Sequence, residues 1–250
     1  MTETGQIGFS QRLQLPWLEY TANLALSGFD RREMTQSLQE YLRDKLSVGG
    51  QSERGNREKA ISILLGIWLV GKPDFPELRL MGLELLRTLP RQQQVPVHWG
   101  MTMAVYPFFG VVAENLGRLL RLQETVSSAQ VLRRLKERYG ERETVLRAAK
   151  RILRVFVDWG VLMDTETPGV YRHVEENRVS PQGDVVPWLL LARLVANDAH
   201  SGALKVLAQH PSLFPFSMET PSPRTFENRK DVTVRSYGFE NEVFLTIGPS

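Results

Sequence analysis

Apolar side chains recur with helical spacing along the first 160 residues of the chain. This repeat predicts four N-terminal helices, over residues 15–28, 31–47, 57–70 and 77–89. Gly28 is placed to end the first helix, and the side chain of Asp30 is placed to cap the second. Two prolines in the sequence GKPDFP separate the third helix from the fourth, because proline cannot continue a helix.

The centre of the chain is its most apolar part. Residues 97–123 contain few charged side chains, so we expect them to form the central core, with a helix over residues 108–122. A second helix is predicted over residues 127–139, with Ser127 or Ser128 as its cap. A third follows the GER turn and covers residues 143–159.

Strand patterns begin after this third helix. The sequences GVLMD (160–164) and GVYRHV (169–174) predict two short strands around a turn at Pro168 and Gly169. The rest of the chain predicts two short helices, an extended proline-rich crossing and a hairpin, over residues 188–200, 201–210, 212–230 and 231–248 respectively.

The order of the central elements is typical of a winged helix-turn-helix, with three helices followed by a two-stranded wing. The sequence therefore predicts a mainly α protein in three parts. Residues 1–94 form an N-terminal helical domain, residues 95–178 the winged helix-turn-helix domain, and residues 179–250 a C-terminal helix and β-hairpin appendage.

Charge is unevenly distributed. The whole chain carries a net charge of +3, but the segment from Arg118 to Arg154 has eleven basic residues against four acidic ones. On the helix over residues 143–159, one stripe is basic and comprises Arg147, Lys150, Arg151 and Arg154. The opposite side is apolar and comprises Val145, Ala149, Ile152, Leu153 and Phe156. Such a helix is suited to pack on a core and face a polyanion.

In a winged helix this third helix enters the major groove of duplex DNA, and the wing reaches the backbone or the minor groove. The predicted DNA-contacting residues are Arg133, Arg134, Arg142, Thr144, Arg147, Lys150, Arg151, Arg154, Arg172 and His173. Two alternatives remain at this point. The stripe is also compatible with a solvated helix face, and a winged helix can instead dock on protein.

Composition narrows the remaining classes. The chain is 42% apolar and has no cysteine, which excludes disulfides, thiolate metal sites and a thiol nucleophile and fits a reducing compartment. Its longest apolar run, residues 60–71, is shorter than the roughly 20 residues that cross a bilayer. The first 15 residues show no secretion signal. We therefore expect a cytoplasmic protein without a membrane partner.

Residues with catalytic chemistry are scattered. His98, His173, His200 and His210 show no metal-ligand spacing, and His98 beside Trp99 is better explained as a core histidine. The sequence PDFPELR lacks the spacing of a nuclease carboxylate pair, and GGQSERGN lacks the Gly-Lys-Ser/Thr ending of a phosphate-binding loop. The sequence predicts no catalytic residues, no metal site and no cofactor.

The sequence does not decide the role of three other groups of residues. Asp158 lies near a helix C-terminus, where we expect it to pair with Arg154 or with a residue of the wing. Trp99, Tyr106, Phe108 and Phe109 are suited to base stacking, but their apolar neighbours favour a buried core. A C-terminal set of aromatics either packs against the winged helix or exposes a patch for a partner or a second copy: Phe214, Phe216, Phe226, Tyr237, Phe239 and Phe244.

The layout of NREKAISILLGIWL, a central apolar helix and a winged helix ending in LRVFVDWGVL resembles the BrxA family of BREX phage-defence systems, over about residues 18–173. The resemblance implies a double-stranded DNA ligand, the other subunits of a multi-protein defence system as partners, and no catalysis by this subunit. The C-terminal part, from about residue 179, has no counterpart in it. The alternatives are an assembly subunit whose winged helix contacts protein, and a transcription regulator with a palindromic site.

Overall fold

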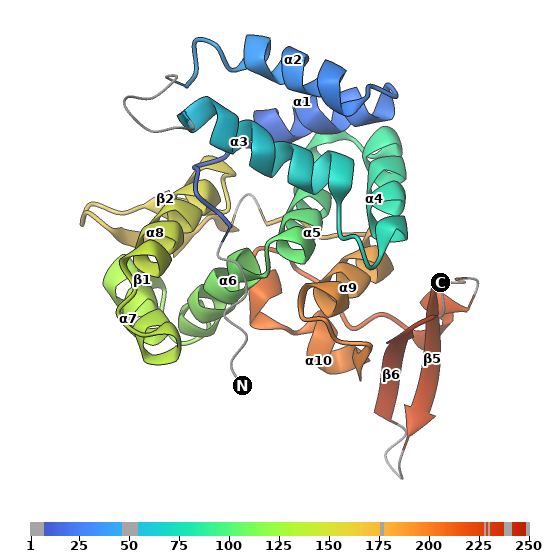
Figure 1. The fold of residues 1–250 in the computed structure, drawn as a ribbon. Coiled ribbons are helices and arrows are strands. Elements are labelled where there is room, and N and C mark those ends of the chain that lie inside the picture. Colours follow the sequence, from blue (N-terminus) through green and yellow to red (C-terminus); the bar gives the residue numbers. More distant parts are fainter. Residues whose placement is uncertain are drawn as a thin grey trace.

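The computed structural model describes residues 8–46, 55–175, 178–227, 229, 231–237 and 242–248. Over these residues the protein is mainly α-helical and carries two small antiparallel sheets, which lie at opposite ends of the molecule (Figure 1). The mainly α class predicted from the sequence is therefore confirmed.

The N-terminal elements are helical, as predicted. They are α1 (Leu15–Leu26), α2 (Arg31–Tyr41), α3 (Asn56–Leu65), the π-helical turn η1 (Gly66–Val70) and α4 (Pro76–Thr88). Asp30 caps α2: its side chain accepts from the Glu33 backbone N–H at 2.8 Å, and the Glu33 carboxylate accepts from the Asp30 N–H at 2.8 Å. The predicted helix over residues 31–47 is wrong in its extent, because α2 ends at Tyr41 and turns follow.

The central apolar segment forms two helices. A short 3-10 turn, η2 (Arg91–Gln93), leads into α5 (Val95–Val105), and α6 (Pro107–Leu120) follows after a bend of 118°. Pro107 occupies the first turn of α6, where its missing N–H costs no hydrogen bond, so the chain turns sharply there. Among the described residues, no single helix is long and apolar enough to cross a membrane, although this bent pair meets the same length and composition test.

The next elements are β1 (Thr125–Ser127), α7 (Ser128–Tyr139), α8 (Glu143–Asp158), β2 (Leu162–Asp164) and β3 (Val170–His173). Gly160 (φ 71°) lets the chain leave α8, and Gly169 (φ 76°) forms the turn before β3, as expected from glycine's freedom at positive φ. The two helices and the two predicted strands are confirmed. The sequence missed β1, which pairs with β3, so the sheet has three strands in the order β1-β3-β2.

The C-terminal part begins with α9 (Val185–Ala196), an apolar helix whose residues are nearly all buried. It continues through β4 (Ser201–Ala203), α10 (Leu204–Ala208), η4 (Pro211–Leu213), η5 (Pro223–Phe226), β5 (Val232–Tyr237) and β6 (Glu242–Ile247). The terminal strands are confirmed, although the turn between them lies outside the described residues. The sequence missed β4, which pairs with β6 and extends the hairpin to the order β4-β6-β5.

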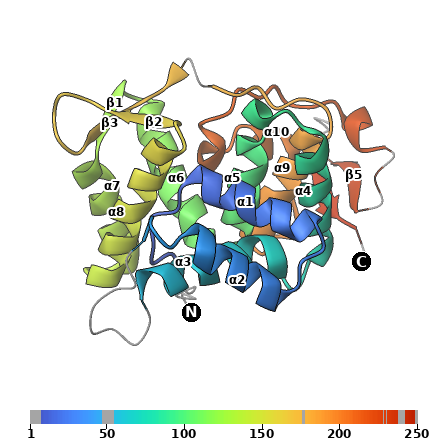
Figure 2. The same cartoon turned by 90° about the horizontal axis from the view of Figure 1, so that it is seen from above.

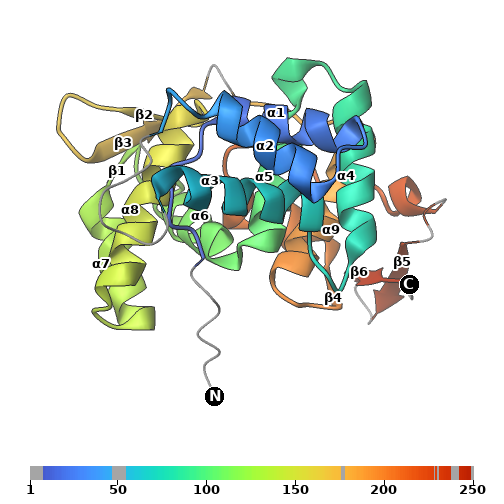
Figure 3. The same cartoon turned by 45° about the horizontal axis from the view of Figure 1, so that its top comes forward.

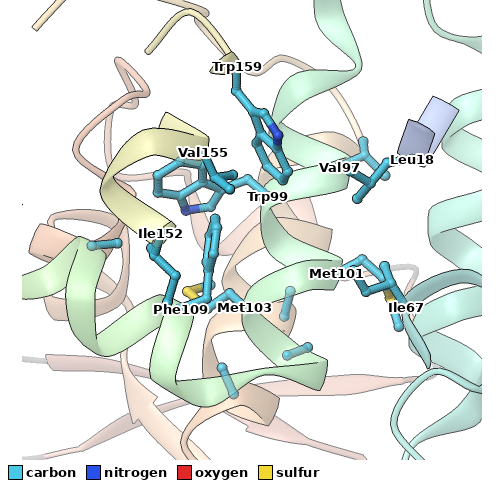
Figure 4. Packing of buried hydrophobic residues seen from close by; sticks show 14 of the residues in the cluster. Leu18, Ile67, Val97, Trp99, Met101, Met103, Phe109, Ile152, Val155 and Trp159 are labelled. Carbon is cyan, nitrogen blue, oxygen red and sulfur yellow. The ribbon is translucent and has the colours of Figure 1, made fainter. Parts of the chain in front are cut away.

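Buried side chains from all three parts of the sequence form one continuous apolar cluster. Its centre is Trp99 of α5, whose ring stacks on Phe156 of α8 at 4.8 Å and meets the edge of Phe109 at 4.8 Å. Figure 4 shows Trp99 and Phe109 between Ile152 and Trp159. The core role expected for the aromatics at residues 99–109 agrees with this packing: Trp99, Phe108 and Phe109 are buried and Tyr106 is half-buried.

The C-terminal aromatics divide between the two expected roles. Phe214 packs against the helical core, with its ring 5.7 Å from Trp99 and 6.0 Å from Phe156, and Phe216 lies 5.8 Å from Trp99. Phe226 is buried as well, and Phe244 on β6 is half-buried. Phe239 and the side chain of Tyr237 lie outside the described residues. The segment is therefore part of the protein's core where it crosses Trp99.

Candidate nucleic-acid interface

The helices α7 and α8 pack against each other at one end of the molecule, beside the β1-β3-β2 sheet (Figure 2). α7 begins with the capping box that Ser127 forms with Gln130. The Gln130 N–H donates to Ser127 Oγ at 3.2 Å, and the Ser127 N–H donates to Gln130 Oε1 at 2.8 Å. A cap at this position fixes where α7 starts, and with it the positions of its basic residues. Of the two serines that the sequence offered, Ser127 is the cap.

α8 has one fully buried side. The five apolar residues predicted for this side are each buried, and Ala148 and Val155 are buried beside them. The opposite side of the helix forms a strip whose residues are exposed or half-buried. Because the buried side is held by the aromatic core around Trp99, the strip has a fixed orientation (Figure 4).

The exposed strip of α8 is basic, but two of its four cations are paired within the protein. Arg147 binds Glu143 one turn earlier, with Nε 2.9 Å and Nη2 2.5 Å from Oε1. Arg154 donates through Nη1 to both carboxylate oxygens of Asp164 on β2, at 2.6 and 2.9 Å. For Lys150 and Arg151 the described part of the chain provides no hydrogen bond or ion pair.

These pairs stabilise the charged forms of their members. The hydrogen bond from Arg147 lowers the pKa of Glu143, and the hydrogen bond to Asp164 raises the pKa of Arg154. A phosphate approaching either arginine therefore competes with a carboxylate that already binds it. Side chains here are well exposed, 58% for Arg147 and 36% for Arg154, so solvent screens both pairs.

Three more predicted basic residues lie on α7 and in the turn before α8. Arg133 and Arg142 are exposed and Arg134 is half-buried, and none of them has an ion-pair partner among the residues described. Thr144, in the first turn of α8, is exposed too. The structure thus places eight of the ten predicted residues on α7, on α8 and in the turn between them.

The two predicted residues of β3 lie against a different feature. Arg172 and His173 line a cavity of about 900 Å³ between the end of α6, β1 and residues 208–218. His173 is mostly buried: its Nδ1 lies 3.0 Å from Glu175 Oε1 and its ring 5.8 Å from that of Phe214. Arg172 is exposed. The structure therefore separates His173 from the basic strip of α8.

The pairing expected for Asp158 is wrong. Its carboxylate binds the guanidinium of Arg12 through both oxygens, whereas Arg154 pairs with Asp164. Arg12 lies 146 positions away, in the segment that precedes α1. In the same region Trp159 Nε1 donates to the Leu13 carbonyl at 3.1 Å. The N-terminal segment is thus fastened across the end of α8, which no spacing in the sequence indicates.

Two further basic residues on α7, Lys136 and Arg138, are exposed but were counted only in the charge surplus. Lys136 binds Glu141 at 3.0 Å.

Over the residues that the structure describes, no group of three or more His, Asp or Glu side chains lies close enough to hold a metal ion. His98 is fully buried against Trp68, with ring centroids 5.3 Å apart, which agrees with a core histidine.

No family model, curated protein or solved structure matches this chain.

Proposed function

We propose that residues 107–173 form a winged helix that binds double-stranded DNA, with α8 as the recognition helix. The observation that carries this proposal is the element order, helix, strand, helix, helix, strand, strand, combined with the sheet order β1-β3-β2. In a winged helix the first strand joins the two wing strands in this way, beside the helix-turn-helix. β1, which the sequence did not predict, supplies the missing strand.

The charge of the exposed surface supports duplex DNA as the ligand. Lys150 and Arg151 on α8 and Arg133 and Arg142 before it have no carboxylate partner among the described residues, so they are available for phosphate. The strip also exposes Thr144, and its arginines and Lys150 are of the residue types that bind guanine as well as phosphate. We propose binding mainly through phosphates, because the surplus of positive charge attracts any duplex whatever its sequence.

The biological setting of the proposal is an accessory, non-catalytic role in a prokaryotic phage-defence system of the BREX kind. The resemblance noted in the sequence provides its support. Neighbouring genes for a methyltransferase, a large ATPase and a phosphatase-like protein would strengthen it, and their absence would remove it. Co-purification of this chain with such subunits is the direct test.

A charge-reversal variant tests the DNA interface. Arg147→Glu, Lys150→Glu and Arg151→Glu together should abolish retention of a random duplex in a mobility shift at moderate salt. The control reverses three exposed arginines, Arg31 and Arg32 at the start of α2 and Arg43 in the turn after it, so that the net charge changes equally. A wild-type affinity that does not fall with added salt, or equal loss in both variants, would contradict phosphate contact by α8.

The same assay separates the two rival functions. Docking of the winged helix on protein predicts no retention of duplex by the wild type, together with a co-purifying partner that the α8 variant loses. A transcription regulator predicts a steep preference for one palindromic site over random duplex.

A further inference from the structure

A second cavity, outside the proposed interface, has a volume of about 970 Å³ and lies among α3, α6, α7 and α9. α6 runs between α7 on one side and α9 on the other (Figure 3), so the cavity extends from the last turn of α7 to the last turn of α9. Four cationic side chains line it against two carboxylates. They are Lys59, Lys72, Arg138 and Arg193, with Glu114 and Asp198.

Arg193 lies in this lining as a buried cation, 6% exposed, on the otherwise apolar helix α9. Its Nε donates to Nδ1 of His210 at 3.0 Å, and its Nη2 lies 2.8 Å from Nε2 of the same ring. Burial, aided by three nearby arginines, lowers the pKa of His210 to about 3, so the ring is neutral at pH 7. A neutral imidazole has one acceptor nitrogen, so one of these two contacts is unsatisfied.

The carboxylate nearest to this pair is already engaged. Glu114 Oε1 lies 3.9 Å from His210 Nε2, but it accepts a hydrogen bond of 2.5 Å from Arg118. Burial lowers the pKa of Arg193 and the charge of Glu114 offsets only part of that effect, so the buried guanidinium lacks the full compensation that a buried charge requires. An anionic ligand in the cavity would supply that compensation.

Two other cations point to the same requirement. Lys59 on α3 and Arg138 on α7 line the cavity without an ion-pair partner in the described part of the chain. Lys72, by contrast, is neutralised by Asp198 at 2.7 Å. Three cations from three different helices are therefore left for one ligand.

The remaining lining is aromatic. Phe108 and Tyr139 meet edge to face with ring centroids 5.7 Å apart, and Tyr106 is part of the same lining. Burial raises the pKa of Tyr106 to about 12, so its hydroxyl keeps its proton and can donate. A volume of about 970 Å³ far exceeds that of a bare phosphate ion, which leaves room for a planar group against these rings.

We propose that this cavity binds a mononucleotide, with its phosphate held by Arg193, Lys59 and Arg138 and its base against Phe108 and Tyr139. The proposal does not depend on DNA binding by α8. Because its ligand would join α3, α7 and α9, binding would also fasten the helix-turn-helix to the rest of the protein.

Calorimetric titration of the full chain without DNA tests the site, with AMP, adenosine and inorganic phosphate as separate probes. AMP should bind, and adenosine and inorganic phosphate should each bind at least tenfold more weakly, because each lacks half of the contacts. The absence of AMP binding at millimolar concentration, or equal affinity for AMP and inorganic phosphate, overturns the proposal.

Two double variants locate the bound AMP. Lys59→Gln with Arg138→Gln should weaken AMP binding at least tenfold. The control, Arg133→Gln with Lys136→Gln, removes two exposed cations from α7 outside the cavity and should leave AMP binding unchanged. Since these four side chains are not part of the buried core, both proteins should fold; equal weakening in both would overturn the assignment to this cavity.

Discussion

Arg154 on α8 donates to both carboxylate oxygens of Asp164 on β2, at 2.6 and 2.9 Å. This contact ties the last turns of the proposed recognition helix to β2, the first strand of the proposed wing. It also makes Arg154, the cation of the basic strip that pairs with β2, less available to bind phosphate. The ion pair with Glu143 has the same effect on Arg147. The protein's own carboxylates therefore limit how strongly α8 attracts a polyanion.

Asp164→Asn should strengthen duplex binding, because it releases Arg154 and removes a negative charge beside it. An exposed ion pair is worth less than about 1 kcal/mol, so the expected gain in affinity is roughly two- to fivefold. Fluorescence anisotropy with a labelled random duplex at fixed salt measures it.

Asp74→Asn is the matched control for this prediction. It makes the same change of charge at an exposed site near the start of α4 and should leave the affinity within error of the wild type. A weaker complex with Asp164→Asn would mean that the position of the wing matters more than the freed charge, and would contradict the prediction.

The helices of the proposed interface could be predicted because their signals are local. The apolar positions of α8, from Val145 to Phe156, repeat with the helical period, and Ser127 with Gln130 forms a cap within four residues. The strand β1 has three residues and no alternation long enough to detect, and it exists because β3 pairs with it. β1 could therefore be predicted only once the fold that brings β3 beside it was known.

Ion pairs between distant residues could not be predicted for the same reason. Arg12 and Asp158 are 146 positions apart, and the sequence offered other oppositely charged partners for each of them. Arg193 is buried and His210 is half-buried, but their sequence neighbours do not distinguish them from surface residues. The cavity that they line could therefore not be predicted from the sequence, whereas the basic strip of α8 could be.

Ser127→Ala should destabilise the protein by about 1 kcal/mol, because it removes the side-chain oxygen that caps α7. The midpoint of urea unfolding at neutral pH measures this loss. Ser128→Ala provides the comparison, since Ser128 lies inside the first turn of α7 and does not cap it. Equal loss from both serines would contradict the assignment of Ser127 as the cap.

His98 should make the free energy of unfolding depend on pH. Burial lowers the pKa of His98 to about 3 from an ordinary value near 6.5, and neither of its ring nitrogens has a hydrogen-bond partner among the residues that the structure describes. As the pH falls below 6.5, the unfolded chain takes up a proton that the folded chain refuses. Stability therefore declines between pH 6.5 and about 3, by up to about 1.4 kcal/mol per pH unit.

His98→Leu should remove this contribution and leave the fold intact, since leucine fills a similar volume and needs no hydrogen bond. The slope that remains should reflect His210, whose pKa is lowered in the same direction. Urea unfolding at a series of pH values compares the variant with the wild type and with His200→Gln, which alters an exposed histidine. A slope unchanged by His98→Leu would show that His98 is not buried as a neutral ring.

Gly100→Ala tests how the C-terminal helix α9 is held against the central core. A β-carbon at Gly100 would lie 2.7 Å from the ring of Trp188 and 2.9 Å from Leu189, so the helices α5 and α9 would have to separate. Overpacking of this kind costs about 1–3 kcal/mol. Trp188 is fixed on its other side, where its Nε1 donates to the Leu78 carbonyl at 2.9 Å, so the ring cannot simply move away.

The double variant Gly100→Ala with Trp188→Phe separates a local clash from a general weakening of α5. Phenylalanine leaves room for the added methyl group, so the double variant should be less destabilised than the sum of the two single variants. Thermal or urea unfolding of the four proteins gives the coupling directly. Additive losses would mean that α9 does not approach α5 at Gly100. The N-terminal and C-terminal parts would then have to pack together through other contacts, such as the contact of Gly82 on α4 with the same tryptophan.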